Sequence, residues 1–135
     1  MLEKVRIIEI PKITDPDGRG SLSVLEKNIL PYSIKRVYYL YDVPSNSTRG
    51  GHAHKELQQC LIALSGSFIV VLDDGKERIE ILLNRPDKGL LIPSGVWREL
   101  IEFSAGAVCL SLVSAEYDED DYIREYEDFI TFKKK

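Results

Sequence analysis

The chain has 135 residues, of which 44% are hydrophobic and 30% are charged, and its formal net charge is −4. This size and composition are typical of a soluble globular domain and exclude an intrinsically disordered chain. The only basic run is Lys133, Lys134 and Lys135, so we expect no nucleic-acid partner and no membrane partner, because both need clustered Lys and Arg.

The N-terminal segment has no feature of a targeting signal. Charged side chains at Glu3, Lys4, Arg6 and Glu9 interrupt any apolar signal core. No apolar stretch approaches the ~20 residues that a membrane-spanning helix needs. We therefore expect a cytoplasmic protein in which residues 1–135 form a single domain.

Short segments rich in Val, Ile, Leu, Tyr and Phe recur along the chain, separated by turns rich in Gly, Pro, Asp and Asn. The Asp73-Asp74-Gly75 turn between two such segments is the strongest hairpin signal. Regular short strands with turns between them predict an all-β sandwich or barrel. The predicted strands span residues 21–26, 34–41, 59–64, 67–72, 79–83, 89–92 and 107–114.

The tail after residue 115 has a different pattern. Tyr122, Tyr126 and Phe129 are spaced i, i+4, i+7, which predicts one face of a short C-terminal helix. Asp120 and Asp121 precede this face, where negative charge interacts favourably with the helix dipole. We interpret the segment as a packing helix with a solvated acidic face.

The two histidines of the chain, His52 and His54, are separated by Ala53 alone. In a strand this spacing puts both imidazoles on one face, together with Gly50, Glu56 and Gln58. Such a pair is suited to metal ligation or to proton transfer, since neutral imidazole does the first and a pKa near ~6.5 suits the second. The structural alternative is a hydrogen-bonded pair in a polar core.

The residues around this pair resemble the cupin superfamily. The first cupin motif is matched by His52-Ala53-His54 and Gly66, but Gln58-Gln59 stands where the motif has an acidic metal ligand. The second motif, PxGxxH, is matched by residues 93–98 except that Arg98 replaces its histidine. The resemblance implies a cupin (RmlC-like) double-stranded β-helix, a jelly-roll barrel. Because Arg is cationic and has no lone pair to donate, we expect no metal and an anionic small-molecule ligand instead.

Six segments together give a closer resemblance, to the sugar-nucleotide 3,4-ketoisomerases, also called WxcM-like. This resemblance covers nearly the entire chain and implies an enzyme that converts dTDP-4-keto-6-deoxyglucose to a dTDP-3-keto-6-deoxyhexose, without a cofactor, for deoxyamino-sugar and polysaccharide biosynthesis. The matching segments are DGRGSL at residues 17–22, IKRVYY at 34–39, RGGHAHK at 49–55, LDDG at 72–75, VWRE at 96–99 and DYIR at 121–124.

The reaction removes a proton from C3, passes through an enediolate and delivers a proton to C4, which a base with a pKa near neutrality can do. The resemblance implies that His52 is this base and that His54 orients it or relays protons. A phenol directed at the enediolate oxygen would stabilise it, and Tyr38 is the candidate. Alternation along residues 34–41 places Arg36 beside Tyr38 on the pocket face, and leaves Tyr39 and Tyr41 to pack on the other.

The remaining candidates bind the substrate. Arg19, in a glycine-flanked turn, and Arg49, just before the histidines, are suited to a diphosphate, which guanidinium groups bind in a bidentate manner. Trp97 either stacks on the nucleotide base or fills the end of the barrel. Arg98 stands where some relatives carry His, so it is expected to bind the sugar or an oxyanion rather than transfer a proton. This leaves the C4 configuration of the product open, with gluco favoured over galacto.

Relatives pair as homodimers through exchanged N-terminal strands, and residues 5–10 are the candidate strand here. Three alternative functions stay open. The first is a related sugar 3,5-epimerase of the same fold, which also uses a His base. The second is a catalytically silent cupin that binds a sugar nucleotide as a sensor or accessory protein. The third, and least favoured, is a metal-dependent dioxygenase.

Overall fold

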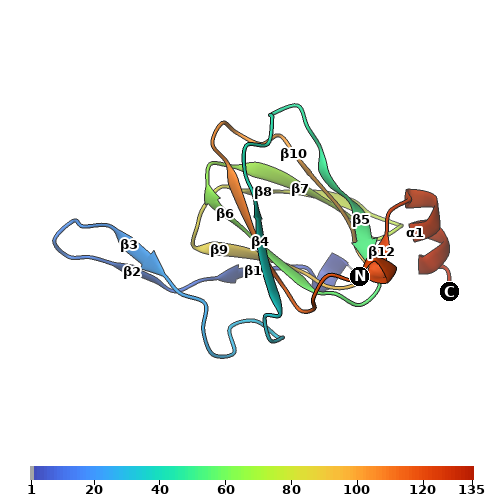
Figure 1. Ribbon diagram of the computed structural model, residues 1–135, viewed down its shortest axis with the longest axis horizontal. Coiled ribbons are helices and arrows are strands. Elements are labelled where there is room, and N and C mark those ends of the chain that lie inside the picture. Colours follow the sequence, from blue (N-terminus) through green and yellow to red (C-terminus); the bar gives the residue numbers. More distant parts are fainter. Residues whose placement is uncertain (1) are drawn as a thin grey trace.

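The computed structural model describes residues 2–135, and two antiparallel five-stranded sheets packed face to face make up most of it (Figure 1). This arrangement confirms the predicted all-β barrel of the cupin type. In spatial order, the strands of the first sheet are β1 (Arg6–Glu9), β9 (Lys88–Ile92), β6 (Gln59–Ser65), β11 (Val108–Val113) and β4 (Arg36–Leu40). Those of the second sheet are β12 (Tyr122–Ile123), β5 (Arg49–His54), β10 (Trp97–Ile101), β7 (Phe68–Asp73) and β8 (Arg78–Leu83).

The predicted hairpin is confirmed between β7 and β8, where Asp73 pairs with Arg78. The Asp74 carboxylate accepts hydrogen bonds from the backbone N–H groups of Lys76 and Glu77, at 2.9 and 2.8 Å. Gly75 has a φ of +93°, a left-handed conformation that glycine adopts at no steric cost. The turn therefore follows directly from its local sequence.

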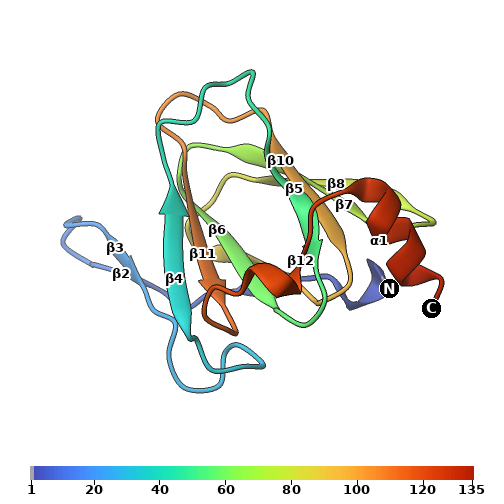
Figure 2. The same cartoon turned by 45° about the vertical axis from the view of Figure 1, so that its right-hand side comes forward.

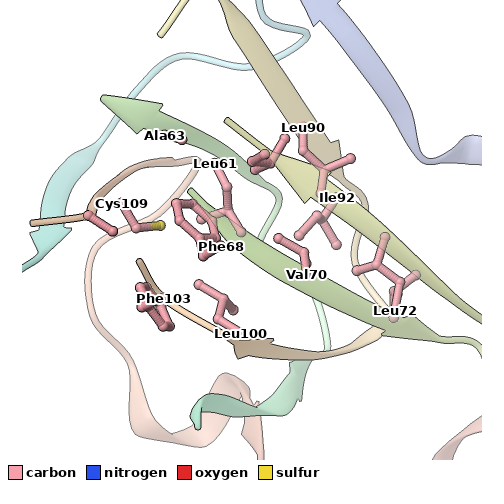
Figure 3. Close-up of a cluster of buried hydrophobic side chains, with 13 residues drawn as sticks. Leu61, Ala63, Phe68, Val70, Leu72, Leu90, Ile92, Leu100, Phe103 and Cys109 are labelled. Carbon is pink, nitrogen blue, oxygen red and sulfur yellow. The ribbon is translucent and has the colours of Figure 1, made fainter. Parts of the chain in front are cut away.

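Apolar side chains from the inner faces of both sheets form the main core between the sheets (Figure 3). Within it, Phe68 and Phe103 stack with their ring centroids 5.1 Å apart. Burying 13 such side chains supplies the main stabilisation of the barrel, since each large apolar group contributes on the order of 2 kcal/mol. The core members are Leu61, Ala63, Phe68, Val70, Leu72, Leu83, Leu90, Ile92, Val96, Leu100, Phe103, Ala107 and Cys109.

The C-terminal tail holds the expected helix, but one turn later than the side-chain spacing predicts. A 3₁₀ turn (Glu119–Asp121) and strand β12 come first, and helix α1 spans Tyr126–Lys133. The prediction that Tyr122 belongs to the helix is wrong, because this residue pairs with His54 at the edge of β5. Figure 2 shows α1 lying against β5 and β12, where Phe129 is completely buried beside Ala53. No helix within residues 2–135 is long and apolar enough to cross a membrane.

A hairpin formed by β2 (Lys12–Thr14) and β3 (Ser21–Ser23) projects from the barrel, and we call it the arm (Figure 1). Ile13 and Leu22 on the arm are 61% and 58% exposed. An isolated two-stranded hairpin is marginally stable in water at best. The arm therefore lacks the apolar support that the other strands receive from their neighbours.

Strand β4 is the outer strand of the first sheet, and one of its faces is apolar and exposed. The sequence predicts packing for Tyr39 and Tyr41, but these side chains are 60% and 61% exposed, and Val37 on the same face is 53% exposed. The packing prediction is wrong for this chain by itself, because residues 2–135 leave the outer face of this edge strand uncovered.

Candidate active site

One cavity of about 340 Å³ opens into the barrel, and strands of both sheets line it. The cavity adjoins the main core, because three of the buried core residues also line it. These are Leu61 and Cys109 of the first sheet and Leu100 of the second. The polar and charged side chains that line its wall are Arg36, Tyr38, Thr48, Arg49, His52, Gln59, Arg98, Tyr122 and Arg124.

Alternation along β5 directs His52 into this cavity and Ala53 away from it, toward Phe129. A bulge precedes the histidines, since His52 pairs with Arg98 whereas Gly50 already pairs with Glu99. Gly50 has a φ of +81°, and a Cβ there would lie 3.2 Å from the Arg98 carbonyl oxygen. The two glycines before His52 therefore let β5 bend closely around β10.

The predicted common face of β5 holds for Gly50 and the two histidines but does not extend past His54. The strand ends at His54, so Glu56 and Gln58 lie outside it and do not line the cavity. The next residue, Gln59, begins β6 and reaches the cavity instead.

His52 and His54 are in edge-to-face contact, with ring centroids 4.9 Å apart. Tyr122 covers both rings, with its centroid 5.0 Å from His52 and 4.4 Å from His54. Only His52 lines the cavity, whereas His54 is 1% exposed and lies behind it. The structure therefore places His52 at the cavity and His54 behind it, in contact with the His52 ring.

Asp121 determines the tautomer of His54. Its Oδ2 atom lies 2.9 Å from His54 Nδ1, and the same carboxylate accepts the backbone N–H groups of Glu56 at 2.8 Å and Leu57 at 3.3 Å. Both oxygens of this carboxylate already act as acceptors for backbone donors, so Asp121 also accepts from His54, whose Nδ1 carries the proton. By contrast, His52 Nδ1 is buried and has no hydrogen-bond partner within residues 2–135.

Both imidazoles are neutral at physiological pH. Burial, reinforced by the positive charge of Arg98, lowers the pKa of His52 to about 3. Burial lowers the pKa of His54 to about 3 as well, reinforced by the positive charges of Arg98, Arg124 and Arg36. His52 is thus held in the form that can accept a proton.

Arg98 begins a buried chain of hydrogen bonds that ends at Tyr38. Its Nη1 donates to Gln59 Oε1 at 2.6 Å, and its Nη2 donates to the Val96 carbonyl oxygen at 2.9 Å. Gln59 Nε2 donates to Tyr38 Oη at 2.7 Å and to Ser111 Oγ at 2.6 Å. Burial lowers the pKa of Arg98 to about 10, which leaves the guanidinium cationic at neutral pH.

Four arginines line the cavity and no carboxylate does, among the residues that the structure describes. Arg36 lies over the ring of Tyr38, 4.7 Å from its centroid, and Arg124 lies 4.2 Å from the centroid of Tyr122. Glu119 neutralises Arg124 in part, with Nε–Oε2 and Nη2–Oε1 distances of 2.6 and 2.8 Å. The remaining excess of positive charge suits a multiply charged anion.

Two predicted binding residues lie outside the cavity of this chain. Trp97 is 5% exposed and packs against Tyr126 and Phe129, because it precedes Arg98 on β10 and points to the opposite face. The indole therefore packs beneath α1, outside the barrel, and takes neither of the two predicted roles within this chain. Arg19 lies on the arm, 76% exposed and paired with Asp15 at 2.8 Å.

Four site residues escaped the sequence reasoning: Gln59, Tyr122, Arg124 and Asp121. The alternation of β6 could have selected Gln59 from the Gln58-Gln59 pair. The other three lie within the DYIR segment at residues 121–124, whose local pattern predicts only a helix face and a family resemblance. Within residues 2–135, no three His, Cys, Asp or Glu side chains are grouped so as to hold a metal ion.

Comparison with known proteins gives the family. The family model described as FdtA, WxcM-like, C-terminal, matches residues 3–134. The chain belongs to this family. It is 47% identical over 125 residues to TDP-4-oxo-6-deoxy-alpha-D-glucose-3,4-oxoisomerase of Aneurinibacillus thermoaerophilus, covering 92% of this chain and 88% of that protein.

Two solved structures extend the comparison within the WxcM-like family. One is a histidine-to-asparagine variant of the 3,4-ketoisomerase QdtA of Thermoanaerobacterium thermosaccharolyticum, in complex with TDP-4-keto-6-deoxyglucose. It is 44% identical, with a TM-score of 0.94, covering 99% of this chain and 96% of that one. The other is the TDP-quinovose 3,4-ketoisomerase WlaRB of Campylobacter jejuni, which is 47% identical, with a TM-score of 0.89, covering 96% of this chain and 98% of that one.

The site of this WxcM-like chain combines three chemical capacities. His52 is a neutral base at the cavity wall, and Tyr38 brings a phenol to the same space. The arginines supply positive charge both for an anionic ligand and for negative charge that develops on an oxygen. Together these groups suit proton abstraction next to a carbonyl group.

Proposed function

We propose that the protein is a sugar-nucleotide 3,4-ketoisomerase whose substrate is TDP-4-keto-6-deoxyglucose. The observation that carries the proposal is that neutral His52 and the Tyr38 hydroxyl share one arginine-lined cavity. A pure binding protein has no use for a neutral base there. The relatives named above as 3,4-oxoisomerase and 3,4-ketoisomerases support the same reaction.

In the proposed reaction, His52 accepts the proton of C3, which the neighbouring C4 ketone makes acidic. The C3–H electron pair forms the C3=C4 double bond, and negative charge moves to O4, where Tyr38 and Arg98 stabilise it. A proton is then delivered to C4, O3 gives up its hydroxyl proton and O4 receives one. The substrate becomes a 3-ketone with no net change in oxidation state.

Binding of the substrate changes the pKa of His52. In the free site burial, and after it the positive charge of Arg98, lowers the pKa of His52. A bound diphosphate offsets the surrounding positive charge, so the pKa of His52 rises on binding. The base therefore becomes stronger only when there is a substrate to act on. Arg36, Arg49 and Arg124 are the proposed diphosphate-binding residues within this chain.

The proposed product has the gluco rather than the galacto configuration at C4. Arg98 replaces the histidine of the second cupin motif and stays protonated at neutral pH, so it binds rather than transfers a proton. The 47% identity to a relative named for TDP-quinovose, a sugar of gluco configuration, supports a gluco product. A large H4–H5 coupling in the product would agree with this assignment, and a small one would indicate galacto.

The proposed assembly is a homodimer with exchanged N-terminal segments. Residues 5–10, the expected exchanged strand, include β1, which pairs with β9 of its own chain. The arm is the better candidate, because Ile13 and Leu22 are exposed on it and the outer face of β4 offers exposed apolar surface. In such a dimer Arg19 would reach the cavity of the partner, where it would bind the diphosphate.

Light scattering should give a dimer for the wild-type protein. An Ile13→Asp, Leu22→Asp double variant should be monomeric, since each change puts a charge on an apolar contact. Arg19→Ala should raise KM and leave the dimer intact. A monomeric wild-type protein would contradict the exchange.

The chemistry of the product also indicates the kind of biosynthesis in which the enzyme takes part. A 3-ketone on a nucleotide-linked deoxy sugar is the acceptor that an amination reaction needs, so the product fits deoxyamino-sugar and polysaccharide biosynthesis. We infer that this takes place in the cytoplasm, and that residues 1–135 act as a single cupin domain.

The deciding experiment follows TDP-4-keto-6-deoxyglucose by proton NMR in deuterated water. We expect loss of the C3 proton signal together with formation of a 3-keto product. His52→Asn should bind TDP and turn over nothing, because it keeps the shape of the site but removes the base. Exchange at C3 and C5 with inversion would indicate an epimerase, and binding without any exchange would indicate a sensor or accessory protein.

A further inference from the structure

The orientation of the Gln59 side chain is fixed by its charged neighbour. Arg98 carries only hydrogen-bond donors, so the atom of Gln59 that lies 2.6 Å from its Nη1 must be the acceptor, Oε1. The reverse orientation would bring two donors together where Arg98 is 1% and Gln59 is 2% exposed, beyond the reach of compensating water. The amide nitrogen is therefore held on the side of Tyr38 and Ser111.

This orientation determines the polarity of the Tyr38 hydroxyl. Gln59 Nε2 can only donate, so Tyr38 Oη is the acceptor in their 2.7 Å hydrogen bond. The proton of the Tyr38 hydroxyl is not used in this hydrogen bond, and no acceptor for it occurs among the described side chains and backbone groups. Tyr38 lines the cavity, so the proton is free to point to a ligand there.

We propose that Gln59 is a positioning residue that keeps Tyr38 a hydrogen-bond donor toward the reacting oxygen of the substrate. The inference rests on the isomerase function proposed above. The donor is oriented before negative charge develops on that oxygen, which is how electrostatic stabilisation acts most effectively. The charge of Arg98 strengthens the effect, because hydrogen bonds in a chain polarise one another.

The sharpest test exchanges the amide for a carboxylate. Gln59→Glu keeps the size of the side chain and gains an ion pair with Arg98, but the new group accepts the Tyr38 proton and turns it away from the cavity. We expect kcat to fall about 100-fold, as for the loss of one oxyanion donor, with little change in the Kd for TDP. Gln58→Glu is the matched control, because it makes the same change one residue earlier, outside the cavity, and should leave kcat unchanged.

A second variant separates positioning from packing. Gln59→Met removes the amide donor without providing an acceptor, so Tyr38 can still direct its proton to the substrate. We expect Gln59→Met to keep more activity than Gln59→Glu, although Glu is the closer match in shape. A residue that only packs would give the opposite order, and that order would overturn the inference.

A double-mutant cycle with Tyr38→Phe completes the test. If Gln59 acts through the Tyr38 hydroxyl, Gln59→Glu has no further effect on kcat in a Tyr38→Phe background. Equal losses in both backgrounds would reject the inference. So would an unchanged kcat for Gln59→Glu in an otherwise active enzyme. A wild-type protein that does not convert the sugar nucleotide at all would instead reject the proposed function, so the two failures are distinguishable.

Discussion

Acidification should destabilise the folded protein through His52 and His54, at a pH above that at which carboxylates titrate. The folded-state pKa of His52 is lowered from 6.5 to about 3. Below about pH 6.5 the unfolded chain therefore binds a proton that the folded chain does not bind, and the free energy of unfolding falls as the pH falls. Between neutral pH and about pH 5 this linkage amounts to about 2 kcal/mol for His52 alone.

His54, whose pKa is likewise lowered to about 3, adds to the loss in the same direction. The lowered pKa of Glu119, about 2, reduces stability only at a lower pH, as the carboxylate becomes protonated. The pH interval from neutral to about 5 therefore isolates the imidazoles.

Equilibrium urea unfolding at these two pH values measures the effect, with the protein concentration held constant because a dimer gains stability by mass action. The variant His52→Asn has no imidazole at this position and should lose about 2 kcal/mol less than the wild-type protein on acidification. Equal losses in the two proteins would refute the reasoning, since His52 would then not be held neutral by its surroundings.

Three further predictions concern residues behind the cavity wall. Asp121→Asn should lower kcat while the Kd for TDP stays the same, because the amide cannot both accept from His54 and face the two backbone donors. An unchanged kcat would show that Asp121 is not needed to position the histidines. Phe129→Ala should reduce the free energy of unfolding, measured by chemical denaturation, by about 3–5 kcal/mol, because this ring on α1 is fully buried. A measured loss below about 1 kcal/mol would contradict this prediction. Trp97→Phe should leave KM for the sugar nucleotide unchanged, since the indole packs outside the cavity; a large rise in KM would put Trp97 in the binding site.

Much of the barrel could be predicted because its local signals agree with the global fold. The turn at Asp74 and Gly75 is satisfied by its own side chain and backbone conformation, so it needs no distant partner. Alternation along β4 likewise placed Arg36 and Tyr38 on the cavity face. The face opposite was misjudged, since its apolar side chains are exposed.

The tail shows why a periodic pattern alone is insufficient. Tyr122 has the spacing of a helix face, but the unpaired edge of β5 provides backbone partners for residues 122–123. Pairing there also brings the Tyr122 ring against both histidines. The competing partner lies about 70 residues away in the chain, so no local pattern could reveal it.

The sequence by itself determined which chemistry the protein carries. Its only two histidines share a strand, Arg98 stands in place of a metal ligand, and the surrounding segments are those of a WxcM-like protein. Only the tertiary structure decided how these groups work together. It placed His54 behind His52, set Asp121 against its ring, and joined Arg98 through Gln59 to Tyr38. Hydrogen-bond direction and burial arise between strands distant in sequence, and therefore appear only when the chain is folded.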